Sequence, residues 1–510
     1  MSERKLPGIL ILLGLVKLLV HLPAMQQYGI FRDELYYLAS TAHLDMGYVD
    51  HPPLSIAILA VIRGLLGDSL IAVRIVPALD GVAMVVVTGL MARELGGGRF
   101  AQALAAVAAI AVPVYLAVHH YYSMNCFDEL FWTLAAYVLI KALKSGRDVH
   151  WALLGVILGL GLLNKISVLW LGAGLAAGLL LTPHRALLTR RGPWLAGAIA
   201  AVLFLPYIIW QILHGWPTLE FMRNAAERKM ASVGFGGFLW SQVLTMNPGT
   251  APIWLAGLAW CLFSREGRPW RILAWIYLTA FAILVASGTS RASYLAPAYT
   301  ILLASGSVAI ERLTQAAAWR RGIRSTAVAL VVSVGIIVAP FALPVLPPDL
   351  FLRYMAAIGI TPRAEERGAR AELPQQYADM FGWDEMARKV AAAYRRLSPQ
   401  EQARCAFFGQ NYGEAAALEV LGPGHGLPEG RTLSGHNSYW LWGPRGLEPE
   451  VMIVLGGDRE DNEQAFEKLD QVDTIECARC MPYERGLEVY VGRRLKRPLA
   501  ELWPELKMYI

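Results

Sequence analysis

The stretch YGIFRDELYYLASTAHLDMGYVDHPPL, residues 28–54, decides how the chain is organised. It interrupts a long series of apolar segments with an arginine, two adjacent acids, a further acid beside a histidine, and two prolines. Ionisable groups near a bilayer cost free energy unless they are paired or serve a function. We therefore expect this stretch to form a polar loop between membrane spans and to carry the chemistry.

The rest of the chain is strongly apolar. Of its 510 residues, 55% are hydrophobic and 17% are charged, and the mean hydropathy is +0.41, whereas about 25% of the residues in an average soluble domain are charged. This composition predicts an α-helical polytopic membrane protein. The net charge of +6 does not indicate a nucleic-acid partner, because cytoplasmic loops of membrane proteins collect lysine and arginine.

Apolar stretches long enough to cross the bilayer recur until about residue 347 and then stop. We predict a transmembrane domain over residues 1–347 with about 11 helices. The expected spans are 6–25, 69–92, 100–121, 127–143, two short spans within 151–181, 193–213, 251–263, 272–289, 293–310 and 325–346. Residues 53–67 are apolar but short, so we expect them to form a helix along the membrane interface, within an outer loop 26–67.

Basic residues beside the spans predict the orientation. Arg4 and Lys5 precede the first span, which places the N-terminus in the cytoplasm. The apolar segment that follows has no cleavage pattern and is read as an uncleaved first helix. The same scheme places these basic residues inside: Arg93, Lys144, Arg147, Arg185, Arg190, Arg191, Arg265, Arg268, Arg271, Arg312, Arg320, Arg321 and Arg324. The loop 26–67 and residues 348–510 are then extracytoplasmic.

The apolar run over residues 151–181 is too long for one straight crossing, at about 46 Å for a helix rising 1.5 Å per residue. Asn164 and Lys165 interrupt it near its middle. We predict two short spans with these two residues at an outer turn.

The last part of the chain, residues 348–510, is ordinary soluble sequence and predicts an extracytoplasmic α/β domain. Residues 383–397 have a helical pattern, and residues 450–455 and 487–491 are short runs rich in β-branched and aromatic residues. Glycine and proline separate these segments at the expected turns.

The five cysteines are too few and too scattered for a disulfide scaffold. Cys126 and Cys261 lie in apolar segments and are expected to be small buried hydrophobic residues. Cys477 and Cys480 lie three residues apart in the exported part, where a local disulfide is favoured and a redox-active dithiol remains an alternative. Two sulfurs alone do not make a four-ligand zinc site.

Asp33 and Glu34, beside Arg32, follow the first span within a few residues. A carboxylate at the membrane surface is well placed to take a proton from a hydroxyl or to hold a metal. A divalent metal is therefore possible, but the spacing of the acids defines no ligand set. The alternative interpretation is a solvated loop with an internal ion pair.

Further polar residues lie near the ends of apolar segments. Asp50 and His51 precede the two prolines and are suited to cap the interfacial helix, which would also fix two polar groups in space. Asp128 lies just inside the span 127–143, where an acid is also favourable to the helix dipole. Lys165 either extends its amine to the membrane surface or binds the phosphate of a lipid.

The predicted topology brings these polar groups to one side of the membrane. At or above the outer surface lie Asp33, Glu34, Asp50, His51, Asp128, Lys165 and Arg291. This predicts a single extracytoplasmic site. A multi-span transporter or flippase is the alternative, although it would place ionisable residues mid-membrane and show two related halves, and the sequence shows no internal repeat. A non-catalytic scaffold with an exported binding domain is a third possibility.

The ordered set of motifs resembles the GT-C glycosyltransferases. It comprises D-E at residues 33–34, D-H-P-P-L at residues 50–54 and F-D at residues 127–128. In particular, the pattern is similar to the bacterial relatives of dolichyl-phosphate-mannose protein mannosyltransferases, glycosyltransferase family 39, which include the aminoarabinose transferase that acts on lipid A. Residues 411–418, NYGEAAAL, and residues 434–444, SGHNSYWLWGP, are also similar to segments of bacterial members.

The resemblance implies an inverting transfer of a sugar from a polyprenyl-phosphate donor to a hydroxyl acceptor. It also implies that the acceptor is a lipid, a glycan or a protein and that the reaction takes place on the outer face of the bacterial cytoplasmic membrane. By this resemblance Asp33 matches the base toward the acceptor and Asp128 the second acid, with Glu34 beside them as a catalytic candidate.

The leaving polyprenyl phosphate needs a cation to stabilise its developing charge. The candidates for this role are Lys165, His51, Arg32 and Arg291, and Asp50 and Tyr48 are expected to form another wall of the site.

The sequence departs from the family pattern at two positions. Protein mannosyltransferases have a lysine just after H-P-P-L, where this chain has Ser55. Lipid A transferases have a lysine just before the two prolines, where this chain has His51. The cation must therefore come from elsewhere. The sugar-binding insert of the eukaryotic enzymes is also missing, which weakens the case for a protein acceptor.

Overall fold

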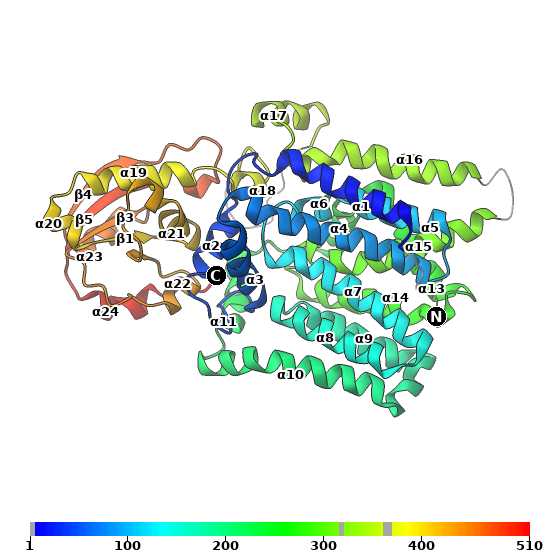
Figure 1. The fold of residues 1–510 in the computed structure, drawn as a ribbon. Helices are drawn as coiled ribbons and strands as arrows, with labels where there is room; N and C mark the ends of the chain where they lie inside the picture. The colour runs from blue at the N-terminus through cyan, green and yellow to red at the C-terminus, as the bar shows by residue number, and fades with distance from the viewer. Residues whose placement is uncertain (1–5, 316–320, 361–369) are drawn as a thin grey trace. The chain divides into compact units, whose positions relative to one another are not determined.

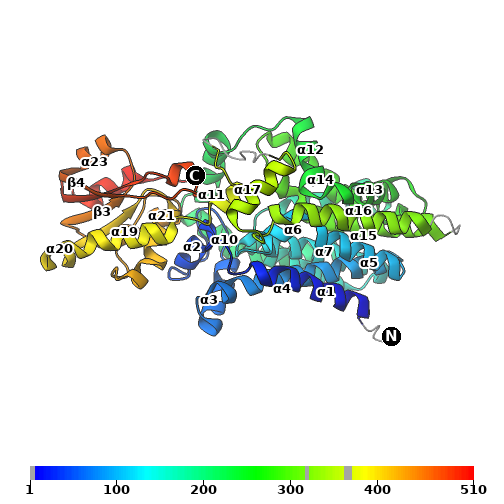
Figure 2. The same ribbon diagram turned by 90° about the horizontal axis from the view of Figure 1, so that it is seen from above.

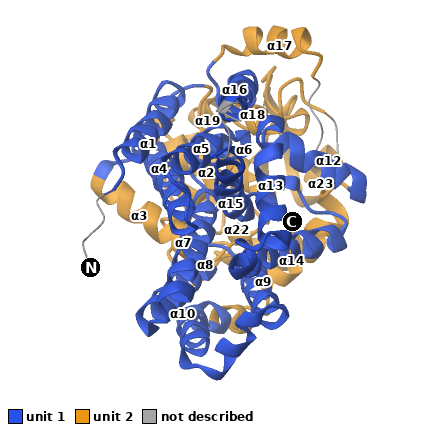
Figure 3. Cartoon of the chain, turned by 90° about the vertical axis from the view of Figure 1, so that its right-hand side faces the viewer, with its two compact units in different colours: residues 1–27, 66–209, 232–345 blue, residues 28–65, 210–231, 346–510 orange. Residues whose placement is uncertain are grey.

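The computed structural model describes residues 6–315, 321–360 and 370–510. The chain forms two compact units, coloured separately in Figure 3. Unit 1 comprises Met1–Gln27, Leu66–Ile209 and Ser232–Val345, and unit 2 comprises Tyr28–Leu65, Trp210–Ala231 and Leu346–Ile510. Arg4, Lys5 and Arg320, on which part of the predicted orientation depends, lie outside the described residues, as does the side chain of Arg321.

Unit 1 is a helical bundle, and each predicted span corresponds to a helix (Figure 1). These helices are α1 Gly8–His21, α4 Leu70–Glu94, α5 Arg99–Ala111, α7 Met124–Ser145, α8 Asp148–Asn164, α9 Val168–Leu181, α10 Arg191–Leu213, α13 Ala251–Phe263, α14 Arg271–Ser287, α15 Ala296–Gln315 and α16 Arg321–Val338. The connecting elements are η1 Leu22–Ala24, α6 Pro113–Val118, η2 Pro183–Thr189, α12 Phe235–Thr245, η4 Pro248–Thr250, η5 Arg268–Trp270, η6 Ala292–Leu295 and η8 Ala339–Phe341. The predicted polytopic helical membrane fold is confirmed.

Within the described residues, five helical segments are long and apolar enough to cross a membrane alone: Leu70–Glu94, Arg191–Leu213, Arg268–Ser287, Ala292–Gln315 and Gly322–Phe341. The pair α9 and η2, bent by 104°, makes a sixth if it counts as one span. Shorter apolar helices occupy other predicted spans. The predicted break in the run 151–181 is confirmed, because α8 ends at Asn164, Lys165 is extended and α9 begins at Val168.

Helix α15 lies at the centre of unit 1, where it contacts α4, α5, α7 and α13. Two glycines explain its close approach to α13. A Cβ atom at Gly257 would lie 2.2 Å from the carbonyl oxygen of Leu302, and one at Gly306 would lie 1.8 Å from that of Ile253. Small residues at such crossings let membrane helices pack backbone to backbone.

Unit 2 contains a five-stranded sheet in the order β2-β1-β3-β5-β4. The strands are β1 Cys405–Gly409, β2 Thr432–Leu433, β3 Val451–Leu455, β4 Phe466–Thr474 and β5 Glu488–Leu495. Strands β1, β2 and β3 are parallel, and β5 is antiparallel to both β3 and β4. Helices α19 Trp383–Arg395 and α21 Tyr412–Val420 contact the sheet (Figure 2). The predicted C-terminal α/β domain, with its helix near residues 383–397 and its strands near 450–455 and 487–491, is confirmed.

A cluster of buried hydrophobic side chains lies on the face of the sheet opposite α19 and α21. Its buried members are Ala406, Phe408, Leu433, Met452, Val454, Phe466, Tyr490, Leu499 and Trp503. The other short helices of unit 2 are α17 Pro348–Ala357, α18 Gln375–Ala378, α20 Pro399–Ala403, η9 Gly422–His425, α22 Ser438–Leu441, α23 Arg459–Ala465, η10 Pro482–Glu484, α24 Leu499–Leu502 and η11 Trp503–Leu506.

The first polar stretch belongs to the same unit as this sheet. It is more ordered than a loop, because it contains α2 Arg32–Ser40, and α3 Leu54–Leu66 follows where the interfacial helix was predicted. Helix α2 packs against α21. Residues 210–231 complete unit 2 with α11 Pro217–Asn224 and the π-helical turn η3 Ala225–Lys229. The division into domains 1–347 and 348–510 remains a prediction.

Candidate active site

Asp33 and Glu34 lie in the first turn of α2, where the helix dipole favours acids. Glu34 is buried, and its Oε2 accepts a hydrogen bond of 2.9 Å from the backbone N–H of Phe31. It therefore secures the start of the helix. The side chain of Asp33 is 34% exposed. Of the two predicted catalytic acids in this turn, Asp33 is the one that solvent or a substrate reaches.

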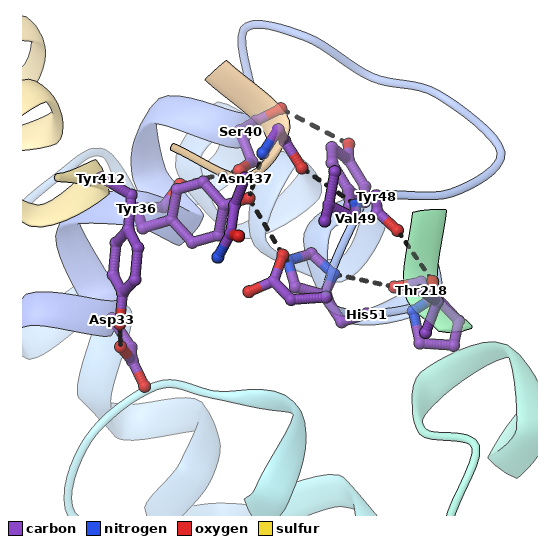
Figure 4. A network of polar contacts seen from close by, with 12 residues as sticks. Asp33, Tyr36, Ser40, Tyr48, Val49, His51, Thr218, Tyr412 and Asn437 are labelled. Carbon is purple, nitrogen blue, oxygen red and sulfur yellow. Dashed lines mark hydrogen bonds and ion pairs between the residues drawn. The ribbon is translucent and has the colours of Figure 1, made fainter. Parts of the chain in front are cut away.

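Tyr412, at the start of α21, holds the Asp33 carboxylate. Its phenol donates a hydrogen bond of 2.9 Å to Oδ1, and Figure 4 shows the ring pointing from α21 toward Asp33. Arg32 Nε lies 3.9 Å from the same oxygen. Among the described residues, Oδ2 of Asp33 accepts no hydrogen bond. One oxygen is therefore fixed and the other is available.

Arg32, a predicted phosphate ligand, is engaged inside unit 2. Its Nη1 lies 3.5 Å from Oδ1 of Asp379 and donates a hydrogen bond to the hydroxyl of Tyr483. Its guanidinium also lies over the ring of Tyr412, 5.3 Å from the centroid. These contacts, with only 11% of the side chain exposed, make Arg32 an internal support of α2.

The motif N-Y-G-E, residues 411–414, begins α21. Asn411 caps the helix, because its Oδ1 accepts from the backbone N–H groups of Gly413 and Glu414 at 2.8 and 3.0 Å. Its Nδ2 donates to Oε1 of Glu414 at 2.8 Å and to Oε1 of Glu484 at 2.9 Å. Burial raises the pKa of Glu484 to about 7, and burial beside Glu484 raises the pKa of Glu414 as well. The pair therefore retains a proton.

The second motif, residues 434–444, supports the first. Nδ1 of His436 accepts from the backbone N–H of Tyr412 at 3.2 Å, and its Nε2 contacts the carbonyl oxygen of Ile510 at 2.7 Å. Burial lowers the pKa of His436 to about 3, so the ring is neutral and its Nε2–H is the donor. Ser438 donates its backbone N–H to the Tyr36 hydroxyl at 3.2 Å. Both motifs thus anchor α2.

Tyr48, one of the two predicted wall residues, lies in a buried aromatic cluster with His51 and Tyr36 (Figure 4), and Asp50, the other, contacts this cluster through Tyr36. Tyr36 donates to Oδ1 of Asp50 at 3.0 Å, and burial raises the pKa of Asp50. The ring of His51 lies 4.7 Å from that of Tyr37 and 4.8 Å from that of Tyr48. At 1% exposure, His51 packs in this cluster, which disfavours its predicted contact with a phosphate.

Asp128 and Lys165 meet within unit 1. Lys165 Nζ lies 3.1 Å from Oδ2 of Asp128 and donates to Oδ1 of Asn125 at 2.9 Å. Ser167 Oγ lies 2.9 and 2.8 Å from the two carboxylate oxygens of Asp128. Asn164 docks the turn by donating to the carbonyl oxygen of Met124 at 2.8 Å.

Arg291 precedes η6 and is partly buried. Tyr294, in the same turn, has its ring centroid 5.6 Å from Nζ of Lys165. The predicted phosphate ligand Arg291 is therefore carried by a turn that contacts Lys165. In the described ranges, no group of three or more His, Cys, Asp or Glu side chains is arranged to hold a metal ion.

Several residues of these clusters were absent from the sequence-based prediction. Tyr412 lies in the quoted motif N-Y-G-E, which was a signal without an assigned role. Asn125 and Ser167 are close in sequence to Asp128 and Lys165, so proximity to predicted residues could have indicated them. Asp379 and Tyr483 carry no local signal.

Similarity to known proteins agrees with these features. A family model described as dolichyl-phosphate-mannose-protein mannosyltransferase matches residues 50–210. The lipid A galacturonosyltransferase RgtD of Rhizobium johnstonii is 25% identical over 331 residues, which cover 64% of this chain and 68% of that protein. The structure of ArnT from Cupriavidus metallidurans bound to undecaprenyl phosphate matches with a TM-score of 0.60 at 14% identity, covering 95% of this chain and 98% of ArnT. The chain is therefore similar in part of its sequence to the protein mannosyltransferases and in its fold to the GT-C glycosyltransferases.

The GT-C fold also matches the archaeal oligosaccharyltransferase AglB from Archaeoglobus fulgidus, in complex with an inhibitory peptide and a dolichol-phosphate. That match has a TM-score of 0.52 at 11% identity and covers 88% of this chain and 69% of AglB. The resemblance inferred from the ordered motifs is thus confirmed.

Proposed function

We propose that this GT-C glycosyltransferase transfers a sugar, with inversion, from a polyprenyl-phosphate donor to a hydroxyl acceptor on the outer face of the bacterial cytoplasmic membrane. The observation that carries the proposal is the carboxylate of Asp33, which is accessible and has one oxygen held by Tyr412. The structures of ArnT with undecaprenyl phosphate and of AglB with a dolichol-phosphate support a lipid-phosphate donor.

Asp33 acts as the general base in this proposal. Its free Oδ2 takes the proton of the acceptor hydroxyl as that oxygen attacks the anomeric carbon. The bond between this carbon and the phosphate oxygen breaks in the same step, and the polyprenyl phosphate leaves with the bonding electrons. A single displacement inverts the anomeric centre.

Lys165 is the proposed cation for the leaving phosphate. Its amine is held by Asp128 and Asn125, so it is oriented before the donor arrives. Asp128 is then a positioning residue for the lysine, and Arg291 is the second candidate cation. Arg32 and Glu34 are assigned to holding α2, because their polar groups are engaged there.

The enclosing wall is formed by Tyr48, Asp50 and His51. These residues are packed against one another and hydrogen-bonded within unit 2. We propose that these residues shape the part of the site that receives the acceptor. Lipid A is the first acceptor to test, because RgtD is a lipid A galacturonosyltransferase and this chain lacks the insert expected for protein acceptors.

The test uses a strain in which the gene for this protein is deleted, complemented with the wild type, Asp33→Asn or Asp461→Asn. Asp461 is an exposed acid in α23 and serves as the control. Mass spectrometry of envelope lipids and glycans measures the sugar that the deletion removes. Wild type and the control should restore it, and Asp33→Asn should lower transfer by roughly 100-fold or more. Normal transfer by Asp33→Asn would refute the base assignment and favour a transporter or scaffold.

The outer location is tested separately. Single cysteines at exposed positions of residues 41–46 and 458–463 should react with a membrane-impermeant maleimide added to intact spheroplasts. Reaction only after the membrane is broken would reverse the proposed orientation.

A further inference from the structure

The contact between Tyr412 and Asp33 joins residues 379 positions apart in the chain. The ring of Tyr412 is buried at 7% exposure and packs on Tyr36, with centroids 4.8 Å apart, and on His436, with centroids 4.9 Å apart. Burial raises the pKa of its phenol, so the hydroxyl stays protonated and remains a donor. A buried, protonated phenol therefore meets an accessible carboxylate.

The backbone around Tyr412 leaves this phenol little freedom. Its N–H is bound by His436, and the side chain before it, Asn411, caps α21. A Cβ atom at Gly413 would lie 2.7 Å from Cγ of Arg32 and 3.0 Å from Cη2 of Trp383. Glycine at this position is what allows α21 to approach α2 closely enough for the tyrosine to reach Asp33.

A carboxylate has a broad torsion about its last bond, so an unrestrained aspartate presents its oxygens over a range of directions. Fixing one oxygen by a hydrogen bond also fixes the plane of the group and thereby the direction of the other oxygen. Misplacement of a catalytic atom by about 1 Å can lower a rate by roughly 100-fold. A rigid hydrogen-bond donor to Oδ1 therefore favours a high rate where Oδ2 must receive a proton, because it keeps Oδ2 in one direction.

We propose that Tyr412 is a positioning residue for sugar transfer, which holds Oδ1 of Asp33 so that Oδ2 faces the acceptor hydroxyl. This inference rests on the proposed function, in which Asp33 is the base. It also gives the N-Y-G-E motif a role in the reaction: Asn411 and Glu414 build the helix start, Gly413 permits the close approach, and Tyr412 makes the contact.

The decisive variant is Tyr412→Phe, which keeps the ring packed on Tyr36 and His436 and removes only the hydroxyl. The matched control is Tyr490→Phe. Tyr490, in β5, is also buried, and its phenol also donates to a carboxylate, that of Glu488. The control removes the same kind of hydrogen bond elsewhere in unit 2.

Transfer is measured in membrane vesicles from the complemented deletion strains, which carry their own donor and acceptor. We expect Tyr412→Phe to lower the rate by roughly 10- to 100-fold and Tyr490→Phe to stay near wild type. The hydroxyl orients the base and does not bind the acceptor, so its loss should lower kcat while the KM for the acceptor stays within about twofold of the wild-type value. A purely structural role would lower the amount of folded protein and leave the kcat of the folded fraction unchanged.

The outcomes separate the inference from the proposed function. If Asp33→Asn is inactive while Tyr412→Phe has the wild-type kcat, the positioning role is wrong and the base assignment stands. If Asp33→Asn is active, or if the deletion removes no sugar, the proposed function itself fails. Equal losses of rate and thermal stability in both tyrosine variants would also overturn the positioning role.

Discussion

The buried acid pair Glu414 and Glu484 makes the stability of unit 2 depend on pH in an unusual direction. The pair is 2% and 1% exposed and is bridged by Asn411. Burial raises the pKa of Glu484 from 4.5 to about 7. Between these values the unfolded chain loses its proton before the folded chain does. The free energy of unfolding should therefore fall as the pH rises from about 4.5 to above 7.

The size of the effect follows from the difference between the two pKa values. Each pH unit between a folded and an unfolded pKa is worth about 1.4 kcal/mol, so deprotonating Glu484 should cost about 3 kcal/mol of stability by pH 8. The change Glu484→Gln removes this cost. Its amide oxygen still accepts from Asn411, and its NH₂ group replaces the shared proton toward Glu414.

Thermal unfolding of the purified full chain in detergent, followed by tryptophan fluorescence between pH 5 and 8, measures the effect. Glu429→Gln, at an exposed position, is the control. We expect wild type and the control to lose Tm as the pH rises, and Glu484→Gln to lose much less. The same pH dependence in Glu484→Gln and in wild type would refute the assignment of a retained proton to this pair.

Three further predictions concern other residues. Lys165→Ala should lower transfer by roughly 100-fold and also destabilise the chain, because it leaves Asp128 buried without its cation. Adding Asp128→Asn to this variant should restore the Tm in detergent but not the transfer activity. Recovered transfer in the double variant would refute the phosphate-binding role of Lys165. Gly413→Ala should cost about 1–3 kcal/mol through overpacking against α2, seen as a lower Tm, and an unchanged Tm would contradict the close approach. The disulfide favoured by the sequence is not formed in the structure, where Cys477 and Cys480 are free thiols and Cys480 Sγ donates to the carbonyl oxygen of Cys477 at 3.0 Å. Their peptide should therefore have the same mass before and after reduction, and a peptide lighter by two hydrogen atoms before reduction would contradict the free thiols.

The membrane helices could be predicted because hydropathy is a local property. The turn at Asn164 and Lys165 was predictable for the same reason, since two polar residues divide one overlong apolar run. The polar stretch after the first span was harder, because its charged residues indicated a loop although they begin α2. The acids at its start interact favourably with the positive N-terminal end of the α2 dipole. Acids in a first turn indicate a helix only when a helix is already expected there.

Pairings between distant residues were beyond the reach of the sequence. Lys165 and Asp128 were both singled out as functional, yet their direct contact depends on the packing of α7 against α8. The contact of Tyr412 with Asp33 depends on how α21 meets α2. Resemblance to a family indicated the motif that holds Tyr412, but only the fold shows which atom the phenol binds.

The backbone around the turn that carries Lys165 contributes electrostatic charge in addition to that of the side chains. Lys165 and Asp128 cancel as a pair, but α7 begins at Met124 and α9 begins at Val168, so two helix N-termini open toward the same few residues. Each such end carries a partial positive charge of about half an elementary charge. The C-terminal end of α8 at Asn164 carries an opposite partial charge of the same size. The three helix ends together therefore leave the turn positive by about half an elementary charge even with its ion pair closed. Because these peptide dipoles do not titrate, that attraction for an anion persists at any pH at which the helices are folded.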